Sequence, residues 1–398
     1  MVSLVQRNPG RFVADRRCAG GGQTLLTELT KTRSSAWPLA LLLGAVVLYA
    51  SLYPFVGWRD QGVEPWAFLL APLPQYWTGF DVASNLLGYV PLGFLLAVAL
   101  VRSGHSLRVG WLGGALMGVG LSLSVETLQN YLPMRVPSNV DFLLNSAGAL
   151  IGASCMVLAW RLGLLRRWAA FRARWLEPSA HGGLVLLALW PLALLYPAPV
   201  PFGLGHIWER LEGGLVEFLM DTPFVEWLPL RLEAPSPLSP LAEAFCISLS
   251  LLSPVLLAFS DMRFLLRRAV FLPLFFLGAF GVAGLSASLT YGPAHAWAWM
   301  SPQVVLGMGI GLLAGLVALP MPRRLCLVLM LMSLATSLSL LNGSPDSPYF
   351  EQSLEVWEQG RFIRFHGVSQ WLGWLWPFAA MAYGLRAVVR QWPAASAH

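Results

Sequence analysis

The distribution of apolar residues along the chain predicts a series of helices that cross a membrane. A span needs roughly 20 consecutive apolar residues, because a hydrocarbon core about 30 Å thick is crossed at about 1.5 Å per residue. Ten stretches meet this requirement, at residues 37–57, 83–101, 109–128, 142–160, 183–201, 242–260, 269–290, 302–319, 325–341 and 368–385. We therefore expect an all-α, polytopic transmembrane helix bundle of about ten spans.

The composition agrees with this pattern and narrows the class of protein. Hydrophobic residues make up 56% of the chain and charged residues only 12%, whereas about a quarter of an average soluble domain is charged. A soluble enzyme is excluded on this ground. An intrinsically disordered chain is also excluded, because such chains have too little apolar surface to bury and this chain has too much.

The placement of the basic residues predicts the orientation of the helices. Lysine and arginine collect on the cytoplasmic side of membrane proteins. Given ten spans, 20 of the 26 basic residues fall in the two terminal tails and in alternate connections between them. We therefore expect both termini in the cytoplasm, with residues 1–36 forming a flexible cytoplasmic tail.

The hairpin made by the third and fourth predicted spans places polar residues at membrane depth. Glu126 and Gln129 lie on one helical stripe near the end of the third span, and Asp141 and Asn145 lie one turn apart at the start of the fourth. Charged side chains there cost roughly 3 kcal/mol each on insertion scales, so their presence needs an explanation. The connection between the spans carries Arg135, which we expect to neutralise one of the two acids.

The second predicted span also begins with polar residues at membrane depth, since Asp81 and Asn85 lie one helical turn apart. The predicted topology places this pair at the level of the hairpin residues, near the outer surface. The residues expected to form one binding site are Asp81, Asn85, Glu126, Gln129, Arg135, Asp141 and Asn145. The alternative is a purely structural role, because buried amides often join membrane helices and an arginine between two acids can fix a fold.

These polar residues belong to a fixed order of short motifs. The order is N-x-x-x-Y-x-P-x-G from Asn85, S-x-E-x-x-Q from Ser124, Arg135 six residues before Asp141, and D-x-x-x-N-x-x-G-x-x-x-G from Asp141. Over residues 37–160 this combination resembles the VanZ-like family of bacterial membrane proteins. The family is named after a protein that confers low-level resistance to the glycopeptide teicoplanin. The resemblance therefore implies a multi-pass protein of the bacterial inner membrane, with a role in the cell envelope or in antibiotic resistance.

A degenerate second copy of the same four-helix unit is predicted at residues 183–320. The segment GLSLSVET returns as GLSASLTY, and Gly148 and Gly152 return as Gly311 and Gly315, all at an offset of about 163 residues. Four spans are an even number, so the copies are expected to be parallel repeats, as in several transporter folds. The second copy has lost the charged residues and is expected to serve as a scaffold.

Two further segments complete the predicted organisation. Residues 325–390 supply two additional spans joined by a polar outer loop. The stretch from His206 to Leu232 is acidic and amphipathic, which predicts a helix lying on the outer interface.

The spacing of the cysteines and histidines suggests no disulfide and no metal site, and no nucleotide-binding or hydrolase motif stands in a usable context. We expect no cofactor, no metal and no nucleic-acid partner. The expected partners are membrane lipids. The sequence gives no information on the oligomeric state.

The polar cluster in an apolar wall favours a protein that binds a polar group at the outer leaflet. A lipid headgroup, a lipid-linked wall precursor or an amphiphilic glycopeptide-type antibiotic would suit it. One alternative is an intramembrane enzyme acting on a lipid headgroup, with Glu126 or Asp141 as general base and Arg135 holding an anionic group. Another is a proton-coupled transporter that uses Glu126. Enzymatic activity is left open, because no activated nucleophile is visible.

Overall fold

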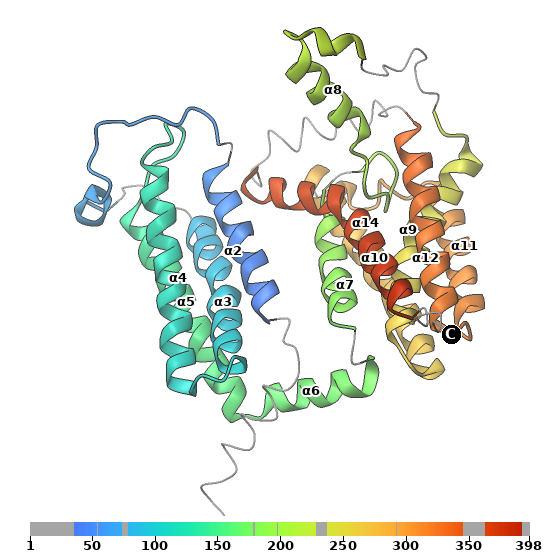
Figure 1. Cartoon of the computed structure of the whole chain (residues 1–398), viewed down its shortest axis with the longest axis horizontal. Coiled ribbons are helices and arrows are strands. Elements are labelled where there is room, and N and C mark those ends of the chain that lie inside the picture. Colours follow the sequence, from blue (N-terminus) through green and yellow to red (C-terminus); the bar gives the residue numbers. More distant parts are fainter. Residues whose placement is uncertain are drawn as a thin grey trace, which may run out of the picture. The chain divides into compact units, whose positions relative to one another are not determined.

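The computed structural model describes residues 36–53, 55–73, 79–177, 180–196, 198–227, 237–291, 293–344 and 363–391, and its regular secondary structure over these residues is helical (Figure 1). The predicted N-terminal tail lies outside these residues, apart from its last position. Most of the predicted polar loop before the last helix also lies outside them.

Ten helices lie over the ten apolar stretches, although α7 ends at Ala193, eight residues before the predicted end of its stretch at 201. They are α2 (Ala36–Leu52), α3 (Gly79–Arg102), α4 (Leu107–Gln129), α5 (Asn139–Arg161), α7 (His181–Ala193), α9 (Pro240–Asp261), α10 (Leu265–Tyr291), α11 (Pro302–Ala318), α12 (Arg323–Asn342) and α14 (Ile363–Gln391). Within the described part of the chain, seven of them are long and apolar enough to cross a membrane. The other three are α2, α7 and α11, with 17, 13 and 17 residues. The all-α bundle is confirmed, while the count of ten spans and their orientation stay predictions.

The connections contain further helical segments. They are α6 (Leu164–Trp175), α8 (Trp208–Leu219) and the short 3₁₀ turns η1 (Ala67–Leu70), η2 (Pro223–Trp227) and η3 (Pro293–His295). The sequence predicts α8, as part of the acidic amphipathic segment, but it does not predict α6. The rings of Trp168, Phe171 and Trp175 stack along one side of α6, with centroids 5.7 and 5.3 Å apart. Because none of its residues is buried, α6 is a basic amphipathic helix on the surface of its unit.

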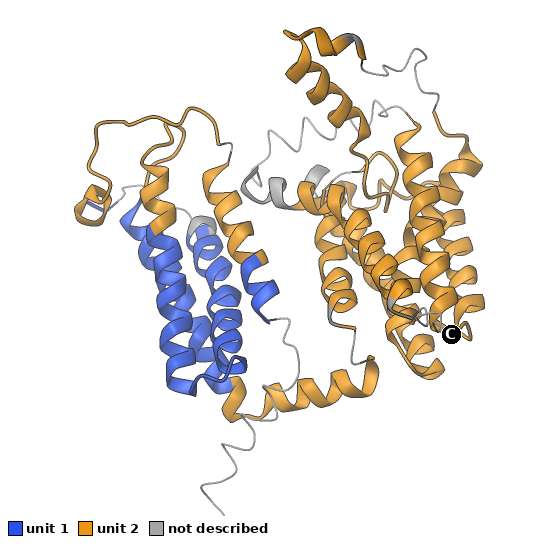
Figure 2. Cartoon of the chain, in the orientation of Figure 1, with its two compact units in different colours: residues 1–41, 72–123, 138–158 blue, residues 42–71, 124–137, 159–398 orange. Residues whose placement is uncertain are grey.

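The helices form two compact units (Figure 2). The first comprises residues 1–41, 72–123 and 138–158, and so holds α3 and most of α4 and α5. The second comprises residues 42–71, 124–137 and 159–398, and so holds α6 to α14 together with most of α2 and the end of α4. The predicted domain limits are not tested by this division and stay predictions.

In the first unit, α3 and α5 pack through glycine residues. A Cβ atom at Gly152 would overlap the carbonyl oxygen of Val90, and one at Gly148 would overlap that of Leu86. Only glycine therefore lets the two backbones approach so closely. Glycines four residues apart favour close packing of membrane helices, and here the partner helix is α3.

In the second unit, α9 packs against α7, α10, α11 and α12 and forms the centre of the bundle. Most of its side chains from Ala244 onward are buried. A Cβ atom at Gly307 of α11 would lie 2.6 Å from the carbonyl oxygen of Ala244, so this pair also meets through glycine. In each predicted copy a glycine contact thus joins the second helix to the fourth, α3 to α5 and α9 to α11. An internal repeat would produce such a correspondence, but the repeat itself stays a prediction.

Candidate functional site

Two hydrogen bonds join predicted polar residues within the first unit. Asn85 of α3 donates through Nδ2 to Oδ1 of Asp141 on α5, at 2.6 Å. Asn145, one turn further along α5, donates through Nδ2 to Oγ of Ser122 on α4, at 3.1 Å. The polar stripes predicted on α4 and α5 therefore meet, and α3 joins them through its asparagine.

Asn145 leaves one strong acceptor unused. Its side chain is 4% exposed, and its Oδ1 has no hydrogen-bond partner among the residues that the structure describes. An unsatisfied buried polar atom costs about 1–3 kcal/mol, so an atom of this kind indicates an external donor or a reservoir of strain. The free acceptor lies one helical turn from the carboxylate of Asp141.

Glu126 is a buried carboxylate on α4. Its side chain is 2% exposed, and it follows Ser122 by one helical turn. Ionisable groups buried in a membrane bundle are rare, and they mark either an internal pair or a functional site. The part of α4 from Ser122 to Glu126 therefore has the character that the sequence predicts for a site.

Gln129 and Arg135 bind backbone carbonyls near the end of α2. Gln129 donates through Nε2 to the oxygen of Ser51 at 3.0 Å. Arg135 donates through Nε and Nη2 to the oxygen of Tyr53, at 3.0 and 2.6 Å, and through Nη2 to that of Ala50, at 3.4 Å. The last carbonyls of a helix lack intrahelical donors, and a guanidinium group there also complements the helix dipole. Both residues thus cap α2, and the acid-neutralising role predicted for the arginine stays a prediction.

Asp81 lies on α3, but its side chain is outside the part that the structure describes. Its predicted place in the site stays a prediction. Of the seven predicted residues, Asn85 and Asp141 are hydrogen-bonded to each other, and Asn145 is bonded to α4.

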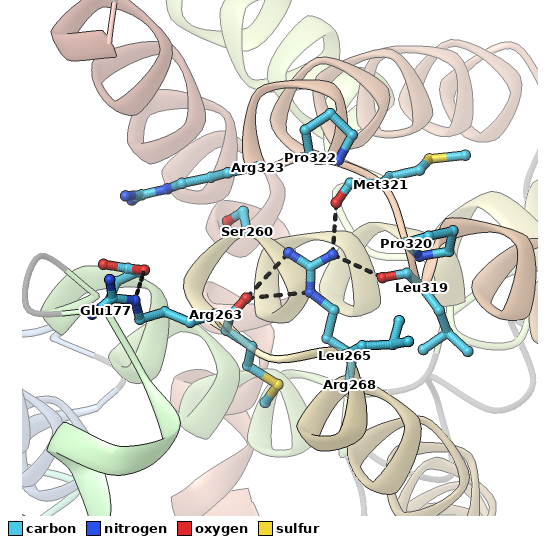
Figure 3. Close-up of a pocket in the computed structure, with 11 residues that line it drawn as sticks. Glu177, Ser260, Arg263, Leu265, Arg268, Leu319, Pro320, Met321, Pro322 and Arg323 are labelled. Atoms are coloured by element: carbon cyan, nitrogen blue, oxygen red, sulfur yellow. Dashed lines mark hydrogen bonds and ion pairs between the residues drawn. The ribbon is translucent and has the colours of Figure 1, made fainter.

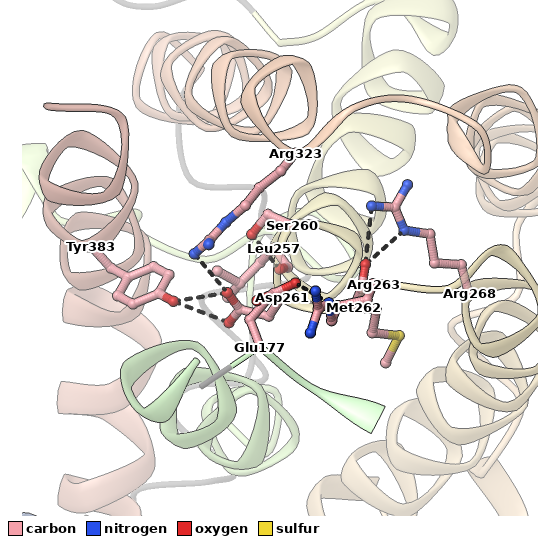
Figure 4. Close-up of polar contacts among 9 residues, drawn as sticks. All are labelled: Glu177, Leu257, Ser260, Asp261, Met262, Arg263, Arg268, Arg323 and Tyr383. Carbon is pink, nitrogen blue, oxygen red and sulfur yellow. Dashed lines mark hydrogen bonds and ion pairs between the residues drawn. The ribbon is translucent and has the colours of Figure 1, made fainter. Parts of the chain in front are cut away.

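The second unit contains a polar cluster that the sequence does not predict (Figure 4). It lies where the end of α9 and the start of α12 meet Tyr383 of α14. The hydroxyl of Tyr383 donates its one proton to the carboxylate of buried Asp261 and lies 2.9 and 3.1 Å from the two carboxylate oxygens. Nη2 of Arg323 lies 3.7 Å from the same carboxylate. The backbone N–H of Glu177 donates to the carbonyl of Asp261 at 2.8 Å, and its carboxylate pairs with Nε of Arg263 at 3.0 Å.

This second cluster connects three helices through one buried carboxylate. Removing one partner of a buried ion pair typically costs about 3–5 kcal/mol, because the other charge is left uncompensated. The sequence does contain one indication of this cluster. Asp261 and Glu177 are acids on the predicted cytoplasmic side, where basic residues dominate. Their partners Tyr383 and Arg323 could not be identified, because they come from helices remote along the chain.

A comparison with protein-family models finds that residues 25–161 match the family described as VanZ/LLP1. The match covers about a third of the chain. No curated protein and no solved structure matches the chain. The matched region contains α2 to α5 and every residue of the predicted polar cluster. Residues 25–161 are therefore similar to the VanZ/LLP1 family, and seven helices of the described residues are long and apolar enough to cross a membrane.

Proposed function

We propose that the protein binds a polar headgroup at the outer leaflet of the bacterial inner membrane, through the cluster around Asp141 and Asn145. The observation that carries the proposal is the buried Oδ1 of Asn145, an acceptor without a donor in the described part of the chain. The predicted topology supports a position near the outer surface, because both residues lie at the first turns of α5.

The chemistry of the cluster favours a ligand rich in hydrogen-bond donors. An ionised carboxylate only accepts hydrogen bonds, and so does the amide oxygen of an asparagine. Asp141 and Asn145 therefore present acceptors, and the sequence predicts Glu126 as a further carboxylate of the site. Hydroxyl and ammonium groups satisfy such a surface. They occur in lipid headgroups, in lipid-linked wall precursors and in glycopeptide-type antibiotics, and the family likeness adds a role in antibiotic resistance to the proposal.

The test uses the full chain in lipid nanodiscs, with teicoplanin and phosphatidylethanolamine as probes. Stabilisation of the protein by each probe is titrated for the wild type, for Asp141→Asn and for Asn145→Leu. Asp60→Asn is the matched control, because Asp60 is exposed in the connection after α2 and the same substitution removes one carboxylate. We expect at least one probe to stabilise the wild type. Its affinity should fall about tenfold in each cluster variant, since one hydrogen bond to a charged group contributes about 1.5–3 kcal/mol.

The proposal fails if neither probe stabilises the wild type, or if the control loses as much affinity as the two cluster variants. A collapse of folded yield in both cluster variants, with normal yield in the control, would assign the cluster a structural role instead. A changed product in a lipid extract would favour an enzyme acting on the headgroup. Dependence of the phenotype on a pH gradient would favour proton-coupled transport.

A further inference from the structure

A cavity of about 380 Å³ lies beside the second cluster, between the turn from α9 to α10 and the turn from α11 to α12 (Figure 3). Its charged lining consists of Glu177, Arg263, Arg268 and Arg323. We call this cavity the arginine pocket. Its volume is at the lower end of the range for small-molecule sites, about 300–1,000 Å³, and suits a compact polar group.

Arg268 gives the arginine pocket a fixed positive charge. Its guanidinium donates to the carbonyl of Met262 at 3.2 and 3.1 Å, and to those of Leu319 and Met321 at 2.9 and 2.6 Å. These oxygens hold the group in place, but they carry no net charge and do not neutralise it. The side chain is 7% exposed. The hydrogen bonds of this buried cation within the described part of the chain go to neutral carbonyls, and such a cation produces a potential that attracts anions.

The two other arginines of the pocket are already paired with acids. Arg263 pairs with Glu177 through Nε, and its side chain is 59% exposed, so its terminal nitrogens can reach a ligand. Arg323 lies 3.7 Å from Asp261, which is longer than a charge-assisted hydrogen bond of about 2.7–2.9 Å. With three arginines and one glutamate, the lining has a formal net charge of +2.

Two helix starts and two helix ends border the arginine pocket. Leu265 begins α10 and Arg323 begins α12, while Ser260 lies in the last turn of α9 and Leu319 follows α11. Helix starts carry partial positive charge and helix ends carry partial negative charge, so their contributions oppose one another. The positive potential of the pocket therefore comes from the three guanidinium groups.

We propose that the arginine pocket binds a phosphate-bearing anion. Guanidinium groups match phosphate oxygens in geometry as well as in charge, which favours phosphate over a simple halide. The phosphate belongs either to an anionic lipid of the cytoplasmic leaflet or to a free phosphate ion. The predicted topology places the pocket on the cytoplasmic side, where basic pockets between membrane helices recognise anionic headgroups.

Glu177 sets the affinity of the arginine pocket in this proposal. Its carboxylate occupies Nε of Arg263, so it competes with an incoming phosphate for the same guanidinium. Glu177→Gln removes the competing charge and raises the net charge of the lining. The variant should therefore bind the anion more tightly than the wild type, which a merely structural ion pair would not do.

The experiment uses the full chain in phosphatidylcholine nanodiscs, with increasing fractions of phosphatidylglycerol as one probe and inorganic phosphate as the other. Stabilisation is measured for the wild type, Glu177→Gln and Arg263→Gln. Arg324→Gln is the matched control, because Arg324 neighbours Arg323 at the same end of α12 but does not line the pocket. We expect Arg263→Gln to weaken binding about tenfold, Glu177→Gln to strengthen it several-fold, and the control to bind as the wild type does.

Arg263 and Glu177 are both partly exposed, so neither substitution should prevent folding. Stabilisation by phosphatidylglycerol that inorganic phosphate does not mimic identifies a lipid headgroup, and stabilisation by inorganic phosphate alone identifies a free anion. Either result supports the proposal if the variants follow the expected order. The absence of stabilisation by both probes, or equal effects of Arg263→Gln and Arg324→Gln, would overturn it. This test involves no residue of the outer cluster and is therefore independent of the proposed function.

Discussion

The glycine contact between α3 and α5 leads to a quantitative prediction for Gly152→Ala. The new Cβ would overlap the carbonyl oxygen of Val90 and lie 2.8 Å from the backbone nitrogen of Phe94. Both neighbours are backbone atoms, so no side chain can rotate away and α3 itself must shift. Overpacking of this kind costs about 1–3 kcal/mol, against a gain of about 1 kcal/mol from the helix propensity of alanine. We expect a net loss of about 1–2 kcal/mol, because backbone overlap places the cost near the top of that range.

Gly120→Ala provides the matched control. It is the same substitution on α4, but a Cβ at Gly120 would meet nothing within 4 Å, so only the helix-propensity gain of up to about 1 kcal/mol remains. The assay is the apparent melting temperature of the purified full chain in detergent, followed by tryptophan fluorescence. Gly152→Ala should melt several degrees below the wild type, and Gly120→Ala at or above it. Equal melting temperatures for the two variants would show that α3 and α5 do not meet at this glycine.

Three further predictions concern other parts of the structure. Tyr383→Phe removes a donor to a buried carboxylate and should cost about 1.5–3 kcal/mol, read as a lower melting temperature; an unchanged value would mean that the bond is not formed. Arg135→Ala removes the cap of α2 and should destabilise by about 1 kcal/mol, whereas Arg59→Ala, at an exposed site in the following connection, should be neutral. In a cysteine-free background, Asp60→Cys should react with an impermeant thiol reagent added outside. His105→Cys should react only after the membrane is opened. Labelling of both variants from one side would refute the predicted orientation.

The helices could be predicted because apolar length is a local property of the sequence. Every predicted stretch overlaps a helix, including α7, which at about 1.5 Å per residue is about 20 Å long and short for a span. The helix α6 escaped prediction because its arginines look like an ordinary basic connection. Its only signal is the spacing of Trp168, Phe171 and Trp175, which places three rings on one face.

The position of polar residues along each helix was equally predictable, but their pairing was not. That Asn85 meets Asp141 depends on how α3 and α5 rotate about their axes, and this follows from the glycine contacts rather than from the polar pattern. Arg135 binds backbone carbonyls, which every residue has and no sequence motif marks. The pair of Asp261 and Tyr383 joins residues 122 positions apart, and no local pattern relates them.

Electron cryomicroscopy of the full chain in nanodiscs made from bacterial lipids tests most directly whether a polar group binds at Asn145. The proposed function predicts density for a non-protein group within hydrogen-bonding distance, about 2.7–3.2 Å, of Oδ1 of Asn145. The same density should be missing from a map of Asn145→Leu. A single water molecule or a protein side chain bonded to that oxygen in the wild type would contradict the proposal, because the buried acceptor would then be satisfied without a ligand.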